Sequence, residues 1–256
     1  MVRLVSDDKS EMSTQGDNTD WKETLVQLND LLNDTSEEYH DKSCELCLRV
    51  LKHQDIPADV KNGASTCYLR LCIRQAEDSS DDILYQKALE IIQQQDNSSY
   101  FAAEHAYCLY RQSKYSKARS ICESVLGKDL SPTSQLSTSV EGLLHIYSQT
   151  LYRLNDLLHA QRVYKHLADN FETSQVSTFE ILTNWVASAK PSKVNDSNVS
   201  AMLKGKQKLS EFYQDPQLVP YDLAYNVATA IAIDSNDPQE LEVSQETFML
   251  ASSHIL

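Results

Sequence analysis

The fold of this chain can be inferred from FAAEHAYCLYRQSKYSKARSICESVL, residues 101–126. This segment has the pattern of two short antiparallel helices, with small residues where the helices cross and tyrosines around the crossing. A second copy, GLLHIYSQTLYRLNDLLHAQRVYKHL, occupies residues 142–167. The two copies align without a gap when Ala118 is matched to Ala160. Internal similarity of this kind indicates a repeat protein.

The composition favours an all-helical protein. Among 256 residues there are five glycines and six prolines, fewer than strands and turns normally need. The formal net charge of -14 argues against a nucleic-acid backbone or an anionic membrane surface as a direct partner. No segment approaches the roughly 18 to 20 apolar residues of a membrane span, so we expect no membrane insertion.

Further helix pairs precede the two copies. Residues 21–32 and 39–53 form a weak first pair, with Ser43 at the crossing position. The next pair begins at Pro57 and has Ala88 at its crossing. Its first helix, ending near Gln75, is predicted to bury Val60, Ala64, Cys67, Tyr68, Leu71 and Cys72. After Phe171 the pattern loosens into helices at residues 179–190, 199–213, 220–233 and 238–256.

These segments predict an all-α, tetratricopeptide-repeat-like superhelical solenoid of antiparallel helix pairs, with about five to six repeats. It spans residues 19–256, after a disordered acidic lead-in at residues 1–18 that has no secretory signal. The chain ends on the apolar run HIL, whereas solenoids need a polar terminal cap. We therefore expect the chain to be part of a longer protein.

The cysteines are predicted to be reduced packing residues. Cys44 and Cys47 form a C-x-x-C whose spacing also occurs in zinc and redox sites, but here it lies within an apparent helix. Cys67 and Cys72 fall in the next helix, and Cys is small and packs well between helices. The alternative is a metal site or disulfides. We expect no metal and no cofactor, and reduced thiols are typical of the cytosol or nucleus.

No catalytic constellation is recognisable, so we expect a binding protein rather than an enzyme. The chain has no glycine-rich phosphate loop and no nucleophile with a recognisable base. In stacked helix pairs the first helix of each pair lines a concave groove that binds peptides. The expected groove-facing residues are Ala103, Tyr107, Tyr110 and Arg111 in the first copy and His145, Gln149, Tyr152 and Arg153 in the second. The alternative is that the tyrosines pack between helices and the arginines are solvated.

Two asparagines and one lysine cluster add to these candidates. Asn184 and Asn226 occupy matching places in TNWVASA and YNVATAI. Each could pair with the backbone of a bound peptide, or could tie two neighbouring helices together. The lysines at 190, 193, 204, 206 and 208 form a local basic cluster, which fits a solvated face better than an RNA site.

Four segments of the sequence resemble a known family. They are FAAEHAYCLYR, IYSQTLYRLNDLLHAQRVYKHLADN, LTNWVASA and YDLAYNVATAIAI, in this order. Together they resemble the N-terminal tetratricopeptide-repeat domain of the 72-kDa subunits of the eukaryotic signal recognition particle. The resemblance covers residues 21–256 and is strongest over 101–233.

The resemblance implies a protein-protein interaction scaffold. In that family the N-terminal repeats bind the C-terminal region of the 68-kDa subunit in a heterodimer, within a cytoplasmic ribonucleoprotein that targets proteins to the endoplasmic reticulum and assembles partly in the nucleolus. The family's lysine-rich RNA-binding segment has no match here, since residues 209–256 contain no Lys or Arg. Particle RNA is therefore expected to bind only indirectly or through a further C-terminal segment. The alternative function is a co-chaperone adaptor that holds an acidic peptide in its groove.

Overall fold

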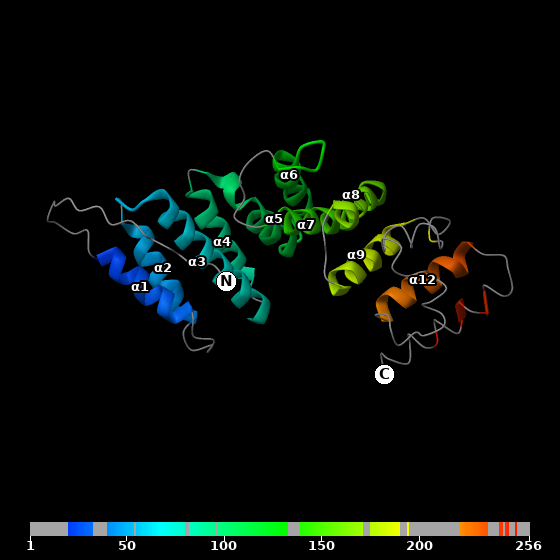
Figure 1. Cartoon of the computed structure of the whole chain (residues 1–256), viewed down its shortest axis with the longest axis horizontal. Helices are drawn as coiled ribbons and strands as arrows, with labels where there is room; N and C mark the ends of the chain where they lie inside the picture. The colour runs from blue at the N-terminus through cyan, green and yellow to red at the C-terminus, as the bar shows by residue number, and fades with distance from the viewer. Residues whose placement is uncertain are drawn as a thin grey trace. The chain divides into compact units, whose positions relative to one another are not determined.

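The computed structural model describes twelve stretches of the chain, and all of its regular structure there is helical (Figure 1). The described residues are 20–32, 40–53, 55–79, 82–95, 97–132, 139–170, 175–189, 194, 221–234, 241–242, 244–245 and 249. The prediction of an all-α protein is thus confirmed for these residues. The lead-in at 1–18, the helix expected at 199–213, the lysine cluster and most of 238–256 lie outside them.

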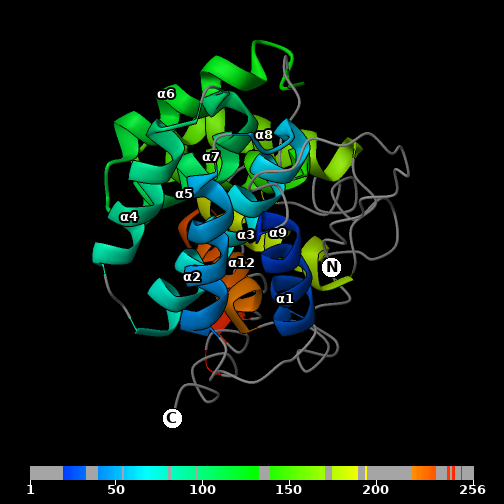
Figure 2. The same ribbon diagram turned by 90° about the vertical axis from the view of Figure 1, so that its left-hand side faces the viewer.

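The contacts divide the chain into two compact units, Met1–Ser113 and Lys114–Leu256. The first unit contains α1 (Asp20–Leu32), α2 (His40–Lys52), α3 (Ala58–Ser79), α4 (Asp82–Gln93), a 3-10 turn (Ser98–Phe101) and α5 (Ala102–Arg111). Each of these helices packs against the next one in the sequence. Helices α1, α2 and α3 lie side by side in both views (Figures 1 and 2).

The second unit contains α6 (Tyr115–Leu126), α7 (Val140–Arg153), α8 (Leu157–Asn170), α9 (Gln175–Ser188) and α12 (Tyr221–Asp234). Here α6 packs against α7, α7 against α8, α8 against α9, and α9 against α12. Packing between sequence neighbours is compatible with a helical repeat protein.

The internal similarity of the sequence extends to the backbone of two turns. Helices α5 and α6 are separated by residues 112–114, and α7 and α8 by residues 154–156. Ser113 has φ 57° and Asn155 has φ 59°, so both lie in the left-handed region. Asparagine is one of the few residues that adopt this region readily. Both positions occupy the same place in the aligned copies.

The hydrogen bonds that end the preceding helices match as well. The backbone N–H of Gln112 donates to the carbonyl oxygens of Cys108 and Tyr110. The backbone N–H of Leu154 donates to the carbonyl oxygens of Thr150 and Tyr152, which are the aligned residues. The two copies therefore share a local conformation, in addition to a residue pattern.

The small residues expected at helix crossings are buried. Ala88, Ala118 and Ala160 are inaccessible to solvent, and Ser43 is almost so. A small side chain allows two helix backbones to approach closely, which a larger one at the same place would prevent. The burial expected of these small residues is therefore confirmed.

Helix α3 differs from its prediction in length and in the residues it buries. It continues to Ser79 and buries Leu69 completely, whereas Leu71 and Cys67 are half-buried. The prediction treated α3 as a helix with one apolar stripe. In the structure α3 packs against α2 on one side and α4 on another, and it also contacts α5. A helix that contacts several neighbours buries residues on more than one side. A prediction based on a single apolar stripe therefore misses some of its buried residues.

Among the described helices, none combines the length and the apolar character that a membrane crossing needs.

Candidate protein-binding surface

Helix α7 presents the predicted groove residues on one face. His145, Gln149, Tyr152 and Arg153 follow the i, i+4, i+7, i+8 spacing of a single helix face. The opposite face of α7 carries the buried residues Leu143, Leu144, Tyr147, Ser148 and Leu151. His145 and Gln149 are half-buried, whereas Tyr152 and Arg153 are exposed. Tyr152 has 41% of its surface exposed, which is high for an aromatic residue beside a helix core.

The matching residues of α5 are less accessible. Ala103 is buried, so a partner could not reach its side chain in this conformation. Tyr107 and Tyr110 are half-buried, and Arg111 is exposed. Of the predicted contacts on α5, Arg111 is therefore the most accessible.

Tyr107 and Arg111 belong to a polar and aromatic cluster within the first unit. The hydroxyl of Tyr107 donates to Oε1 of Glu77 on α3, and Nη1 of Arg111 donates to the same hydroxyl at 2.8 Å. Nη1 of Arg111 also lies 3.4 Å from Oε1 of Glu77. Burial and the hydrogen bond to Glu77 raise the pKa of Tyr107 to about 12.

The same guanidinium group covers two aromatic rings. It lies 5.3 Å from the ring centroid of Tyr85 on α4 and 5.7 Å from that of Tyr107. The two rings meet edge to face, with centroids 6.5 Å apart. Cation–π contacts of this kind contribute about 0.5–1 kcal/mol at exposed sites. Tyr107 and Arg111 thus connect α5 to α3 and α4. For Tyr107 this fits the alternative interpretation, in which the tyrosines pack between helices.

Asn226 ties two helices together. Its Nδ2 donates to the carbonyl oxygen of Thr183, at 3.3 Å, and so links α12 to α9. This contact fits the second interpretation of Asn226, in which its side chain links two neighbouring helices. Asn184 lies next to that carbonyl group on α9 and is half-buried. Substitution of Asn226 would therefore disturb helix packing as well as any peptide contact.

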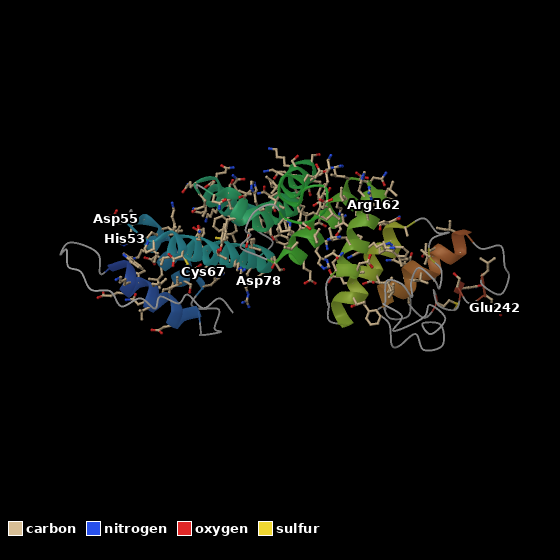
Figure 3. All side chains as sticks on the ribbon, turned by 45° about the horizontal axis from the view of Figure 1, so that its top comes forward. His53, Asp55, Cys67, Asp78, Arg162 and Glu242 are labelled. Carbon is tan, nitrogen blue, oxygen red and sulfur yellow. The ribbon has the colours of Figure 1, made fainter. Side chains whose placement is uncertain are left out.

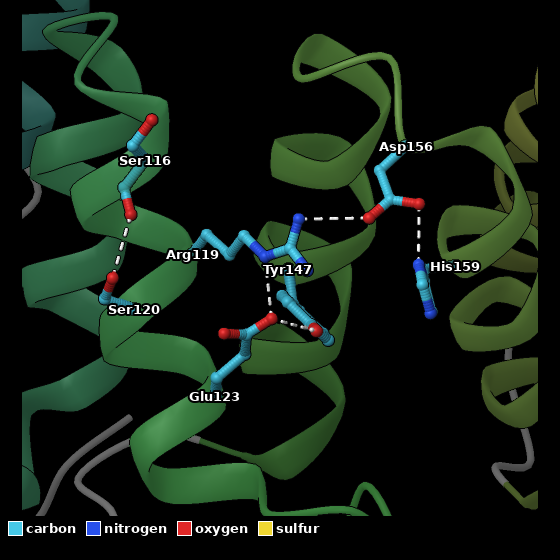
Figure 4. A network of polar contacts seen from close by, with 7 residues as sticks. All are labelled: Ser116, Arg119, Ser120, Glu123, Tyr147, Asp156 and His159. Atoms are coloured by element: carbon cyan, nitrogen blue, oxygen red, sulfur yellow. Dashed lines mark hydrogen bonds and ion pairs between the residues drawn. The ribbon is translucent and has the colours of Figure 1, made fainter.

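A second polar network connects α6 with α7 and the turn before α8 (Figure 4). Arg119 on α6 contacts Oε1 of Glu123 through Nε at 2.7 Å and Oδ2 of Asp156 through Nη1 at 3.0 Å. The hydroxyl of Tyr147 on α7 donates to Oε1 of Glu123 at 3.1 Å. Nδ1 of His159 lies 2.6 Å from Oδ1 of Asp156.

Sequence reasoning did not identify this network. The Arg119–Glu123 spacing of four residues is a signal for a helical ion pair and could have been noticed. The contact between Arg119 and Asp156, by contrast, spans 37 positions in the sequence. It depends on how α6 packs against α7, so no local pattern reveals it.

The contacts of Asp156 predict a pH-dependent contribution to the stability of the second unit. Partial burial raises the pKa of Asp156, but the hydrogen bonds and charges of His159 and Arg119 outweigh it, so the pKa is lowered overall. A carboxyl group with a lowered folded pKa stabilises the fold above its unfolded pKa of about 3.9, and loses this contribution as the pH falls through the folded value.

We expect Asp156→Asn to lower stability at pH 7 and to flatten the loss of stability below about pH 4. Urea denaturation at a series of pH values measures both effects. The matched control is Asp169→Asn, which alters an exposed carboxylate near the other end of α8. Equal acid sensitivity in the wild type and Asp156→Asn would contradict the assignment.

In the described part of the chain, no group of three or more His, Cys, Asp or Glu side chains could hold a metal ion. No protein-family model matches the sequence, and no curated protein matches it either.

Proposed function

We propose that this chain is a tetratricopeptide-like repeat protein that binds a partner protein and catalyses no reaction. The observation that carries the proposal is the repeated helix–turn–helix unit. Ala118 and Ala160 are buried at matching positions, and the turns at Ser113 and Asn155 share one backbone conformation. Solenoids are built from a helix pair that recurs along the chain with the same small residue and the same turn.

We further propose that the protein acts as the N-terminal repeat domain of a signal recognition particle 72-kDa subunit in the cytoplasm. Its partner is then the C-terminal region of the 68-kDa subunit, and particle RNA binds only indirectly or through a further C-terminal segment. The four segments that occur in the same order as in that family support this assignment. The net charge of -14 disfavours direct RNA binding.

The exposed face of α7 is the proposed contact surface. Tyrosine and arginine are frequent anchors of protein interfaces because each combines apolar area with a polar tip. Tyr152 and Arg153 are adjacent and exposed at the end of α7. Tyr107 and Arg111 are engaged by Glu77 and Tyr85, so changes on α5 would mix effects on folding with effects on binding.

Replacing Tyr152 by alanine is expected to weaken binding to the C-terminal region of the 68-kDa subunit by about tenfold or more. The folded state should be little affected, because the side chain is exposed. Isothermal titration with the purified partner region measures the affinity, and thermal unfolding verifies the fold.

Leu158→Ala is the matched control, since Leu158 is 68% exposed on the second helix of the same pair. Its affinity should remain within about twofold of wild type, because groove contacts come from first helices. An unchanged affinity for Tyr152→Ala would refute the α7 surface. No binding by the wild type, together with micromolar binding of a short acidic peptide, would favour the co-chaperone function instead.

A further inference from the structure

Helix α8 has an exposed face that is apolar near its start and basic further along. Leu158, Arg162 and Lys165 are spaced by four and three residues, so they lie on one side of the helix. All three side chains are exposed, and Leu158 has 68% of its surface accessible to solvent. The buried residues of α8 lie on its other sides: Ala160, Val163, Tyr164, Leu167 and Ala168. The three exposed residues, called the α8 face below, therefore point away from the packed interior of the second unit (Figure 3 labels Arg162).

The first copy of the repeat has no such face. The aligned residues of α6 are also exposed, but they are polar or acidic: Ser116, Ser120 and Glu123. In contrast, the aligned Ala118 and Ala160 are buried in both copies. The repeat unit needs a small interior residue, but it does not need an apolar or basic residue on the outside of its second helix. Packing within the repeat therefore does not account for the α8 face.

The cations of the α8 face have no counterions among the described residues. The carboxylate of Asp156, just before α8, already contacts Arg119 at 3.0 Å in the network of Figure 4. Asp169, the acidic residue of α8 itself, lies in its last turn, beyond Lys165. Within the described part of the chain, the side chains of Arg162 and Lys165 make no ion pair or hydrogen bond. Although the whole chain has a formal net charge of -14, the α8 face carries a local positive charge that attracts anionic groups.

The last part of the chain has the opposite character. Residues 209–256 contain no Lys or Arg but eight Asp and Glu, at positions 211, 215, 222, 234, 237, 240, 242 and 246. Of these, Asp222 on α12 and Glu242 are exposed (Figure 3 labels Glu242). Large apolar side chains are exposed here as well: Tyr225, Ile233, Leu241 and Met249. Exposed apolar patches rimmed by polar residues commonly mark interaction sites.

A hydrogen bond joins the residues after α12 to that helix. The hydroxyl of the buried Ser244 donates to the carbonyl oxygen of Ala228 on α12, at 2.6 Å. Leu241 and Glu242 precede Ser244 by about one helical turn, so they too lie beside α12. The C-terminal surface is defined here by the exposed residues of both segments: Asp222, Tyr225, Ile233, Leu241 and Glu242. Its apolar and acidic side chains thus come from two packed segments of the second unit.

We propose that the α8 face of one copy of this chain binds the C-terminal surface of a second copy. Arg162 and Lys165 then meet the carboxylates of Asp222 and Glu242, and the exposed apolar side chains of both surfaces are buried together. Repulsion between two chains of net charge -14 is screened beyond about 8 Å at physiological salt, so the charges in direct contact decide.

The contact joins unlike surfaces, so it is heterologous and links copies head to tail. It goes beyond the proposed function, because the α8 face belongs to the second helix of its pair, whereas the proposed contact with the 68-kDa subunit lies on α7.

Sedimentation velocity of the full chain tests the proposal, at concentrations of about 1 to 300 µM in about 0.15 M salt. The wild type is expected to associate as its concentration rises, so that the mean mass exceeds that of one chain. Reversing the charge of the α8 face, by Arg162→Glu with Lys165→Glu, should weaken the association at least about tenfold. The matched control is Lys52→Glu with Lys87→Glu, which changes the net charge equally at exposed positions of the first unit. The control should associate like the wild type.

A charge exchange identifies the two surfaces as partners. Asp222→Lys with Glu242→Lys should weaken the association as the α8 reversal does. A chain with all four substitutions has complementary charges again, in exchanged places, and should recover the association. Circular dichroism verifies the fold of each variant.

The proposal is overturned if the wild type stays monomeric over the whole concentration range, or if the α8 reversal weakens association no more than the control does. It is also overturned if the chain with four substitutions is folded but stays monomeric. The wild type, the α8 reversal and its control decide the question even where a substitution near α12 prevents folding.

Discussion

Replacing Leu69 by alanine is expected to destabilise the first unit by about 3 kcal/mol, within the usual range of 2–5 kcal/mol for a buried leucine. Leu69 is fully buried on α3, a helix that packs against α2 and α4. The substitution removes apolar contacts and leaves a cavity that tightly packed neighbours cannot fill. Urea denaturation followed by circular dichroism measures the loss.

Leu71→Ala is the informative comparison. The sequence pattern assigned Leu71 to the core and passed over Leu69, whereas the structure leaves Leu71 half-buried. We expect Leu71→Ala to cost about half as much as Leu69→Ala or less, since less apolar area is removed from water on folding at this position. The exposed Ile83 on α4 provides a third variant, Ile83→Ala, with a cost near zero. A larger loss at Leu71 than at Leu69 would show that the core of α3 is placed wrongly.

Replacing Ala160 by leucine is expected to destabilise the second unit by about 2–3 kcal/mol, at the upper part of the range for overpacking a close-packed core. Ala160 is inaccessible to solvent on α8, where that helix packs against α7. The isobutyl group of leucine cannot be accommodated unless the helices move apart. Denaturant unfolding measures the effect, and near-ultraviolet circular dichroism reports any loosening of the packed aromatic residues.

The matched control for this substitution is Ala187→Leu. Ala187 lies on α9 in the same unit and is exposed, and leucine has nearly the helix propensity of alanine. Its stability should remain within about 0.5 kcal/mol of wild type. If Ala160→Leu lowered stability as little as Ala187→Leu, Ala160 would not lie at a close helix crossing. The alignment of the two copies would then have no packing requirement behind it.

The accessibility of the candidate residues was predictable on α7 and only in part on α5. On α7 the spacing of Gln149, Tyr152 and Arg153 places them on the face opposite the core, and helical periodicity alone indicates this. On α5 the aligned Arg111 is exposed too, but Glu77 and Tyr85 engage it. Those two residues belong to other helices, so a local pattern could not reveal these contacts of Arg111.

The helices and the burial of their small residues could be predicted from the sequence by itself. Helix periodicity and the need for a small residue at a close crossing are local requirements, and they leave local patterns such as the match of Ala118 to Ala160. The burial of Leu69 and the ion pair between Arg119 and Asp156 were decided by tertiary structure alone. Each depends on which helix face meets a neighbour from elsewhere in the chain, and helix packing rather than residue spacing determines that.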